Sequence, residues 1–487
     1  MIRVSFYLLI VLFVMKCSTA SMKNNIELVD EQSKDWPIFS DFKDYGLNDF
    51  WSKDTDSTLF FMIRDFDLNN RGLKLIDVQS KINSIFYHLN SNGTVPQVSL
   101  DINGGYGEQN LSGLGLSDDL LESIQGDSSN DNNDGSQGQS DSQVSSFGSS
   151  TYSARLNTYW EIDLWGKISN MNKYYKSNML SQTYDLEYAR ISLKAQFIKG
   201  FISTININNE IKIFENNLSN LRKIKDITEN RIASGLSRPN EIHIASSNYF
   251  LYESNLLSKK IELKSILRKI ELMLGRYPSG KMMIPVSYPD DVCDIKSKLS
   301  SDLILRRPDI LSKRENLNSS NSKLISHKKA MFPSFSLTNS IGQSSSDLNS
   351  LFDPKSSVWN IGLNIVQPIF QSGRLKKNVQ IAQNELTYSD IQYIESVMNA
   401  FYETESFLDL DKNLKEIQEK ITLSVDNIQK AVDFAIRSYE LGLVDLVYVL
   451  NLQQQLFTTQ KQLENIIARR YLNRVDLILA LGGNFEY

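Results

Sequence analysis

One stretch of the sequence comes close to a phosphate-binding loop. Gly275, Gly280 and Lys281 have the spacing at which backbone N–H groups and a lysine ammonium group cradle a phosphate. Met282 stands where such a loop needs a Ser or Thr hydroxyl for the metal, and Pro278 removes one backbone donor. The stretch also follows a helical pattern, whereas the loop normally follows a strand. We therefore expect residues 275–281 not to bind a nucleotide.

Side chains that could perform other chemistry are few. The three histidines, His88, His243 and His327, are scattered and have no paired cysteine or carboxylate pattern. The two cysteines, Cys17 and Cys293, are too few for a disulfide scaffold or a metal cluster. Nothing in the pattern supports nucleophilic or acid/base catalysis. We predict that the protein is not an enzyme and uses no cofactor and no metal.

The charge balance argues against nucleic acid as a partner. The 487 residues include 52 Lys and Arg against 57 Asp and Glu, which gives a net charge of -5. A protein whose main surface binds phosphates carries an excess of basic residues instead. The length is sufficient for two or three ordinary domains or for one elongated architecture.

The first residues predict export. Arg3 precedes an apolar run over residues 4–15, which is too short to span a bilayer as a helix but suits a signal peptide. Small residues at 18–20 allow cleavage after Ala20, which makes residues 1–20 the signal peptide. In the alternative, Cys17 is the acylated cysteine of a lipoprotein, although Lys16 is a poor residue before it. Beyond residue 15 no run of 18 apolar residues occurs, so we expect no membrane-spanning helix.

Three glycines recur at a spacing of 207 residues, and the residues beside them agree. The pairs are Gly166 with Gly373, Gly235 with Gly442, and Gly275 with Gly482. A fixed spacing with matching neighbours is the signature of a tandem duplication. We therefore predict two structural repeats, over residues 96–275 and 306–482.

Each repeat contains a long segment without proline, in which apolar residues recur every three or four positions. This pattern predicts helices over residues 167–234 and 374–441, each about 100 Å long at the usual rise per residue. Shorter helices are predicted over 236–274, 443–481 and 306–331. Gly235 and Gly442 then lie at the tips of antiparallel helical hairpins. A soluble coiled-coil stalk is the alternative for these segments taken alone.

Four other segments alternate with a period of two, so that one face is apolar and the other polar. In the last of them Trp359, Ile361 and Leu363 alternate with Asn360, Gly362 and Asn364. These segments predict one strand hairpin per repeat, the second over residues 333–372. Each strand has about nine to eleven residues, the length that a tilted strand needs to cross a bilayer. A soluble sheet packed on one face is the alternative.

Four strands cannot close a barrel, and an open sheet edge inside a membrane leaves backbone groups without hydrogen bonds. Three copies of the chain would supply twelve strands. We therefore predict a mainly α fold with a membrane β-barrel portion. In this fold the tandem repeat supplies four strands and long helical hairpins per chain. Three chains trimerise into a 12-stranded barrel and an α-helical tunnel.

The other segments connect these elements. We expect residues 21–95 to form an N-terminal segment, 276–305 a linker and 483–487 a tail. The loop of the first hairpin, residues 113–150, is rich in Asp, Asn, Ser and Gly and cannot bury a core, so it is predicted to be disordered. Its acidic residues lack the spacing of a calcium-binding loop.

Several motifs, in this order, resemble the TolC-like outer-membrane efflux proteins, and among them the NodT-type outer-membrane factors. The matching stretches are residues 159–167 (YWEIDLWGK), 305–310 (LRRPDI), 332–337 (FPSFSL), 367–374 (QPIFQSGR) and 480–485 (ALGGNF). The resemblance covers roughly residues 95–487. It implies a homotrimer in the bacterial outer membrane with a helical tunnel in the periplasm, a periplasmic adaptor protein and an inner-membrane pump. It also implies a first helix, for which residues 59–83 are the candidate.

The resemblance further assigns the hairpin tips to adaptor docking and to a closable pore entrance. The tip residues are Gly235, Leu236, Ser237, Gly442, Leu443 and Val444, and the entrance residues are Tyr448, Asn451 and Gln454. Family members commonly carry aspartates at the positions of Tyr448 and Asn451, and often Arg at that of Gln454. This chain departs from that pattern, so we expect closure by tyrosine packing and amide hydrogen bonds.

The function expected from these features is a passive exit duct in the outer membrane, which conducts small molecules such as drugs from the adaptor and pump to the outside. One alternative is the outer-membrane channel of a type I protein secretion system. Another is a soluble periplasmic coiled-coil adaptor. The sequence leaves the transported substrate open.

Overall fold

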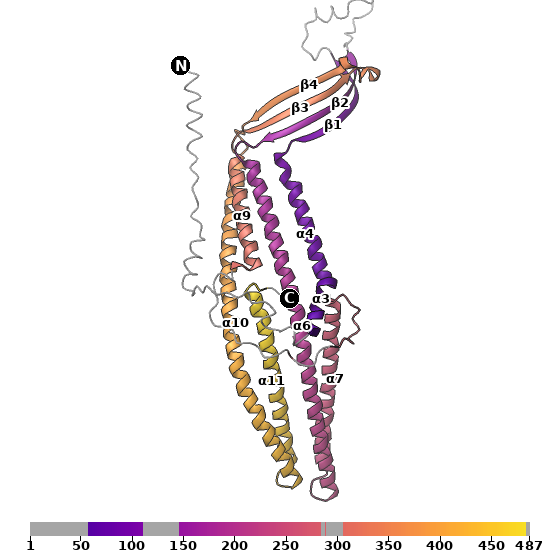
Figure 1. Ribbon diagram of the computed structural model, residues 1–487, viewed down its shortest axis with the longest axis vertical. Coiled ribbons are helices and arrows are strands. Elements are labelled where there is room, and N and C mark those ends of the chain that lie inside the picture. Colours follow the sequence, from indigo (N-terminus) through magenta and orange to yellow (C-terminus); the bar gives the residue numbers. More distant parts are fainter. Residues whose placement is uncertain (1–56, 111–145, 284–287, 289–304, 484–487) are drawn as a thin grey trace, which may run out of the picture. The chain divides into compact units, whose positions relative to one another are not determined.

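The computed structural model describes residues 57–110, 146–283, 288 and 305–483, and it consists of long helices and one antiparallel sheet (Figure 1). The predicted signal peptide, both cysteines, the acidic run of the first hairpin loop and most of the predicted linker lie outside these residues. No helix in the described part of the chain is long and apolar enough to cross a membrane.

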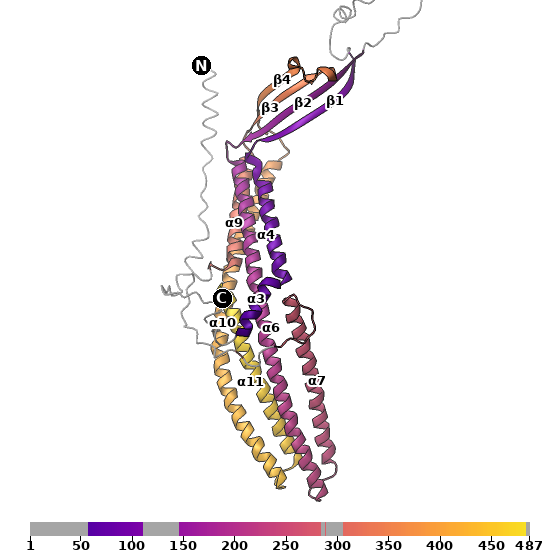
Figure 2. The same cartoon turned by 45° about the vertical axis from the view of Figure 1, so that its right-hand side comes forward.

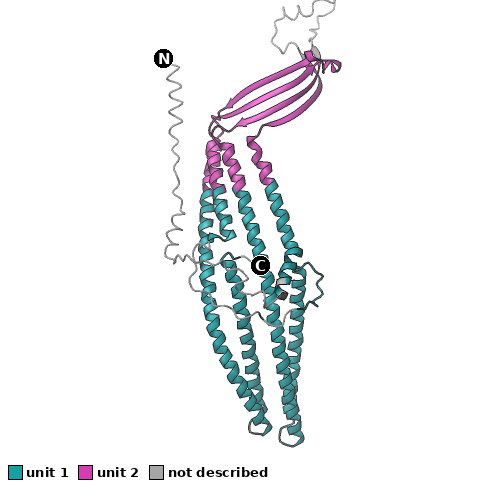
Figure 3. Ribbon diagram, viewed as in Figure 1, with its two compact units in different colours: residues 1–85, 177–318, 386–487 teal, residues 86–176, 319–385 magenta. Residues whose placement is uncertain are grey.

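The described residues fall into two compact units that do not follow the two sequence repeats. The first unit takes its residues from 1–85, 177–318 and 386–487, and the second from 86–176 and 319–385 (Figure 3). Each unit therefore contains segments of both repeats. The reason is that helices α6 (Lys167–Ala233) and α10 (Arg374–Glu440), one from each repeat, have residues in both units, so neither unit coincides with a repeat.

The second unit contains the sheet, whose four strands are paired in the order β1-β2-β3-β4 (Figures 1 and 2). The strands are β1 Gln97–Asn110, β2 Ser146–Ile162, β3 Ser334–Ser345 and β4 Ser357–Val366. All three pairings are antiparallel. One row across the sheet consists of Leu100, Leu156, Ile341 and Trp359, all exposed in the single chain. The sheet thus presents an unburied apolar face.

Strands β1 and β2 are longer than the sequence predicted, with 14 and 17 residues. The prediction that the loop 113–150 is disordered is wrong at its C-terminal end. Residues 146–150 belong to β2 and pair with residues 106–110 of β1. The ladder uses backbone groups, so it continues through polar residues that carry no apolar alternation. At its other end β2 stops at Ile162, because the Asp163 carboxylate accepts hydrogen bonds from the N–H groups of Ile168 and Ser169.

Two helices of equal length dominate the chain. Helix α6 (Lys167–Ala233) and helix α10 (Arg374–Glu440) each have 67 residues and begin directly after a glycine with positive φ, Gly166 and Gly373. Helix α7 (Glu241–Met273) follows α6, and α11 (Leu446–Ala480) follows α10. Helix α9 (Pro308–Lys329) precedes β3. Pro308 suits its place because the first helical N–H has no partner within a helix.

The single helix expected over residues 59–83 is in fact two, α3 (Ser57–Asn69) and α4 (Arg71–Asn90). Asn70 interrupts them. Its side-chain oxygen accepts a hydrogen bond from the N–H of Leu73 at 3.0 Å, and its amide nitrogen donates to the carbonyl of Met273 at 2.6 Å. An Asn that caps the following helix and binds a distant carbonyl competes with a continuous helix.

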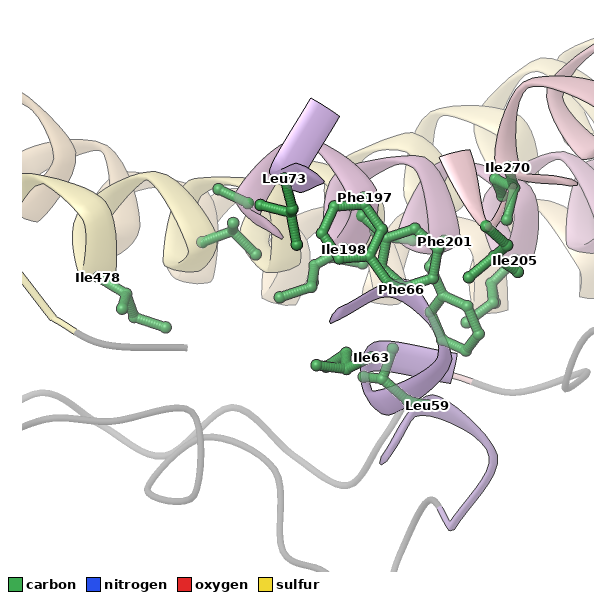
Figure 4. Close-up of a cluster of buried hydrophobic side chains, with 14 residues drawn as sticks. Leu59, Ile63, Phe66, Leu73, Phe197, Ile198, Phe201, Ile205, Ile270 and Ile478 are labelled. Carbon is green, nitrogen blue, oxygen red and sulfur yellow. The ribbon is translucent and has the colours of Figure 1, made fainter. Parts of the chain in front are cut away.

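The largest buried cluster lies in the first unit and joins α3 and α4 to α6, α7 and α11. Leu59, Ile63 and Phe66 pack against Phe197 and Phe201, as Figure 4 shows. The rings of Phe66 and Phe197 are 4.9 Å apart. A second cluster, with Leu221, Ile224, Ala245, Ala435, Tyr439, Leu446 and Val449, joins α6, α7, α10 and α11 near their glycine turns. This second cluster positions the candidate site.

Candidate functional site

The two hairpin tips reverse through the same backbone motif. The N–H of Gly235 donates to the carbonyl of Ile232 and that of Leu236 to the carbonyl of Arg231, at 3.0 and 2.8 Å. Gly442 and Leu443 repeat this pattern at the end of α10. Gly235 has φ +75° and Gly442 φ +80°, which side chains with a Cβ rarely adopt. The glycines therefore end the long helices at defined residues.

The predicted tip residues differ in exposure. Leu236 and Leu443 are 66% and 72% exposed, so both leucines project from the tips in the single chain. Ser237 is half-buried and its hydroxyl accepts a hydrogen bond from Arg231 Nε at 2.9 Å. Val444 is half-buried and packs on the second buried cluster. The structure thus places the six tip residues at two turns, and only the leucines offer free apolar surface.

Arg231 connects one tip to the other. Its guanidinium group lies over the ring of Tyr439, with 4.7 Å between the guanidinium carbon and the ring centre. The same group donates to the carbonyls of Tyr439 and Leu236. Arginine can do this because its planar guanidinium combines several donors with a face that stacks on aromatic rings. We call Arg231, Tyr439, Glu241 and Thr228 the tip lock.

The Tyr439 hydroxyl completes the tip lock. It donates to Glu241 Oε2 at 3.1 Å and lies 3.1 Å from the hydroxyl of Thr228. Tyr439 is 1% exposed and Thr228 is fully buried, so water cannot replace these hydrogen bonds. The lock joins the ends of α6 and α10 to the start of α7. It holds the two tips together within one chain.

The tip lock could hardly be predicted from the sequence. In the repeat register Ser438 corresponds to Arg231, and Ile232 corresponds to Tyr439, so the lock breaks the symmetry of the duplication. A basic residue in the last helical turn is a weak signal, because α10 also has one, Arg437, which is exposed. What distinguishes Arg231 is its contact with Tyr439, which lies 208 positions later in the sequence.

The three predicted entrance residues share one face of α11. Tyr448, Asn451 and Gln454 are all exposed in the single chain, while Val449 and Gln453 face the protein interior. Asp445 accepts a hydrogen bond from the N–H of Tyr448 at 2.7 Å and caps the helix. The face that carries the three residues therefore offers a phenol and two amides, with no charge at these positions.

The stretch that resembles a phosphate-binding loop is occupied by the protein's own carboxylate. Glu271 accepts hydrogen bonds from the N–H groups of Gly280, Lys281 and Met282, at 2.6, 3.2 and 3.1 Å, and from the hydroxyl of Ser279. Burial alone would raise the pKa of Glu271, but these hydrogen bonds outweigh it and lower the pKa. The donors that a phosphate would need are already used.

The other candidate chemical groups are dispersed. His88 and His327 lie in the last turns of α4 and α9, and His243 lies in α7. Across the residues that the structure describes, no three His, Cys, Asp or Glu side chains are arranged to hold a metal ion. Cys17 lies outside the described residues.

Arg307, in the LRRPDI motif, connects three helices. It is only 3% exposed and makes a bidentate pair with Asp309, at 3.1 and 2.8 Å. It also donates to Glu403 of α10 at 2.9 Å and to the carbonyl of Ala480 at the end of α11. Burial alone would lower the pKa of Arg307, but these carboxylates raise it. The motif thus has a structural role that its sequence did not reveal.

Comparison with known proteins gives consistent matches. Residues 87–276 and 299–483 match the family described as Outer membrane efflux protein. The chain is 28% identical over 335 residues to the Cation efflux system protein CusC of Escherichia coli (strain K12), which covers 68% of this chain and 73% of that protein. It is 26% identical over 342 residues to the Probable outer membrane lipoprotein SilC of Salmonella typhimurium, covering 69% and 73%. A solved structure of CusC matches with a TM-score of 0.77 at 24% identity, over 92% of this chain and 97% of that one.

Proposed function

The chain belongs to the outer membrane efflux protein family, and from this membership we propose that it is the exit duct of a tripartite export system in the bacterial outer membrane. The duct performs no reaction of its own. It provides an aqueous path from a periplasmic adaptor and an inner-membrane pump to the outside, and the pump supplies the energy.

The sheet supports a trimeric barrel. Among the described residues β1 pairs only with β2 and β4 only with β3, so each outer strand has one edge without a partner. An unpaired edge in lipid leaves backbone groups unsatisfied at a cost of several kcal/mol each. Three copies joined edge to edge would remove every such edge and form twelve strands. The exposed apolar row through Leu100 and Trp359 would then face the lipid.

The helices support the same assembly. Helix α4 carries exposed Leu75, Val78 and Ile82 at helical spacing, and α10 carries exposed Ile391 and Met398. Stripes of this kind bury against another helix when one is available. Packing between copies would cover them and complete an α-helical tunnel in the periplasm.

The hairpin tips are suited to docking an adaptor and to closing the entrance. Leu236 and Leu443 are exposed at turns that occur six times in a trimer, and they would dock into apolar sites on the adaptor. Tyr448, Asn451 and Gln454 would line the entrance, with opening as a two-state movement of the helices biased by adaptor binding. The tip lock would act within each copy and favour the closed state.

Small molecules are the proposed cargo. The names of the relatives indicate different cargoes. CusC is named for cation efflux, and another relative, TtgI of Pseudomonas putida, is named for toluene efflux. A channel of a type I protein secretion system is the alternative. Acylation of Cys17 remains a further proposal, for which the lipoprotein name of SilC is the support.

The observation that carries the proposal is the family match combined with a four-stranded sheet whose outer edges lack partners. The test is extraction of the protein from bacterial membranes. We expect release only by detergent, as a trimer that dissociates on heating in gel electrophoresis. A water-soluble monomer would contradict the duct and favour a soluble coiled-coil adaptor.

A second experiment tests the partners. A photo-crosslinker at Leu236 or Leu443 should capture an adaptor in cells, while the same crosslinker at Leu423, exposed on α10 but away from the tips, should not. Loss of the protein should raise accumulation of small-molecule substrates inside the cells. Loss of a secreted protein without such accumulation would favour the secretion channel.

A further inference from the structure

A dense group of basic residues lies in the second unit, next to the ends of the strands. The three segments 163–176, 323–332 and 367–380 contain nine Lys or Arg and one acidic residue, Asp163. The whole chain, by contrast, has a net charge of -5. The positive charge is therefore concentrated in one place.

Most of these cations have no carboxylate partner. Lys167 pairs with Glu161 at 2.5 Å, and Lys323 with Glu385 at 2.8 Å. The other seven form no salt bridge among the described residues, and we call them the basic cluster. They are Lys173, Lys176, Lys328, Lys329, Arg374, Lys376 and Lys377, of which all but Lys329 are exposed.

The three segments are brought together by direct contacts. The Ser326 hydroxyl of α9 donates to the carbonyl of Lys167 in α6 at 2.9 Å, and Gln367 donates to the carbonyl of Met331. A small hollow is lined by Lys167, Lys329 and Gln371, among others. Figure 3 shows these helix ends within the second unit.

The helix dipole favours Lys328 and Lys329, which lie in the last turn of α9, but it does not account for the basic residues of α10. Arg374, Lys376 and Lys377 lie in the first turn of α10, where the helix dipole favours negative side chains. At α6 the Asp163 carboxylate accepts hydrogen bonds from the first N–H groups, whereas α10 has no acidic residue in its first turn. The three cations of α10 therefore repel both one another and the start of their helix, and an external anion would relieve that repulsion.

Exposed apolar residues accompany the charges. In the turn between β4 and α10, Ile369 is 95% exposed and Phe370 is 84% exposed. Leu164, between β2 and α6, is also exposed. Lysines beside projecting apolar side chains are typical of segments that lie at a membrane surface, where the apolar groups enter the acyl region.

We propose that the basic cluster binds the headgroups of anionic phospholipids, in the membrane leaflet that adjoins the helices. This proposal rests on the proposed location in the outer membrane, which puts the strand ends at the bilayer surface. Helix α6 begins five residues after β2 ends, and α9 ends five residues before β3 begins. The basic cluster thus lies within about 15 Å of the strand ends along the helices. A protein partner is a poorer fit, because lysines are depleted from protein interfaces.

The test measures lipid selectivity of the full-length protein in bilayers. Spin-labelled phosphatidylglycerol and phosphatidylcholine are compared by the fraction immobilised at the protein. We expect the relative association constant to favour phosphatidylglycerol at least threefold, and to approach one in 1 M salt, where the screening length is about 3 Å.

Variants locate the effect. Replacement of Lys173, Lys328, Lys376 and Lys377 by Gln should abolish the preference for phosphatidylglycerol. A matched variant with the same number of exposed lysines replaced in the first unit, at Lys223, Lys412, Lys420 and Lys430, should retain it.

Each other outcome overturns the proposal in a distinguishable way. Equal association of both lipids with wild-type protein in the bilayer would refute lipid binding and leave the duct intact. Loss of the trimer in the first variant, without lipid selectivity in the wild type, would assign the basic cluster to contacts between copies. Failure of the protein to enter bilayers at all would refute the proposed function as well.

Discussion

The guanidinium carbon of Arg231 lies 4.7 Å from the centre of the Tyr439 ring, although 208 residues separate the two in sequence. This contact joins the tip of the first helical hairpin to that of the second. Because it lies within one chain, it can favour one arrangement of the tips before any adaptor binds.

Replacement of Tyr439 by Phe should loosen the tips. The ring would still accept the Arg231 guanidinium, but Thr228 and Glu241 would lose the hydroxyl between them. Leaving a buried group without its partner costs about 1–3 kcal/mol. Hydrogen exchange should accelerate near Thr228, and cells should admit more of a large antibiotic through the channel. Tyr448→Phe, at an exposed tyrosine, is the control and should leave exchange at the tip lock unchanged.

Replacement of Arg231 by Lys should resemble replacement by Ala, although Lys keeps the charge. The guanidinium donates to Leu236, Ser237 and Tyr439 at once, and a lysine ammonium cannot reproduce that planar geometry. Antibiotic influx should rise in both variants. Arg222→Lys, at an exposed site on the same helix, should not raise it. A lysine variant with wild-type influx would show that charge alone is sufficient.

The two tip glycines should respond unequally to alanine. Both have positive φ, so each replacement should cost roughly 1–2 kcal/mol in the turn. A Cβ at Gly442 would also lie 3.3 Å from a guanidinium nitrogen of Arg231, whereas one at Gly235 meets nothing within 4 Å. Gly442→Ala should therefore disturb the tip lock more, as measured by hydrogen exchange at Thr228. Equal effects would contradict this contact.

Glu271 should make stability depend on pH. Its pKa is lowered below the ordinary value of 4.5, so the folded state binds its proton less readily than the unfolded state. The carboxylate thus stabilises the fold fully above about pH 4.5, and this contribution is lost as the pH falls through the lowered value. Glu271→Gln should destabilise the protein at pH 7, and the difference from wild type should shrink below pH 4. The exposed Glu419→Gln variant should show no such difference in thermal unfolding.

Multivalent cations should block the channel poorly from the periplasmic side. Tyr448, Asn451 and Gln454 are uncharged, so the entrance has no anionic ring at these positions to hold a trivalent ion. Single-channel recordings with a trivalent cation should show weak block in the wild type. Block should strengthen when Tyr448 and Asn451 are both changed to Asp. Tight block of the wild type would contradict the assignment of the entrance.

Features that depend on near neighbours in the chain could be predicted from the sequence alone. Gly235 and Gly442 bond to carbonyls three positions earlier, and the leucines that follow them bond to carbonyls five positions earlier, so the repeat of glycines was sufficient to place both turns. The alternation around Trp359 likewise indicated strand β4, because successive side chains in a strand face opposite sides.

Only the tertiary structure decided which distant residues meet. Arg231 and Tyr439 are not related by the repeat, and Arg307 binds Glu403, 96 residues away, so no local pattern announces either contact. The loop of residues 275–281 had the glycines and lysine of a phosphate site, but folding brought the Glu271 carboxylate to its N–H groups. Local sequence determines which backbone turns are possible, whereas burial and hydrogen bonding across the fold determine which partner each polar group receives.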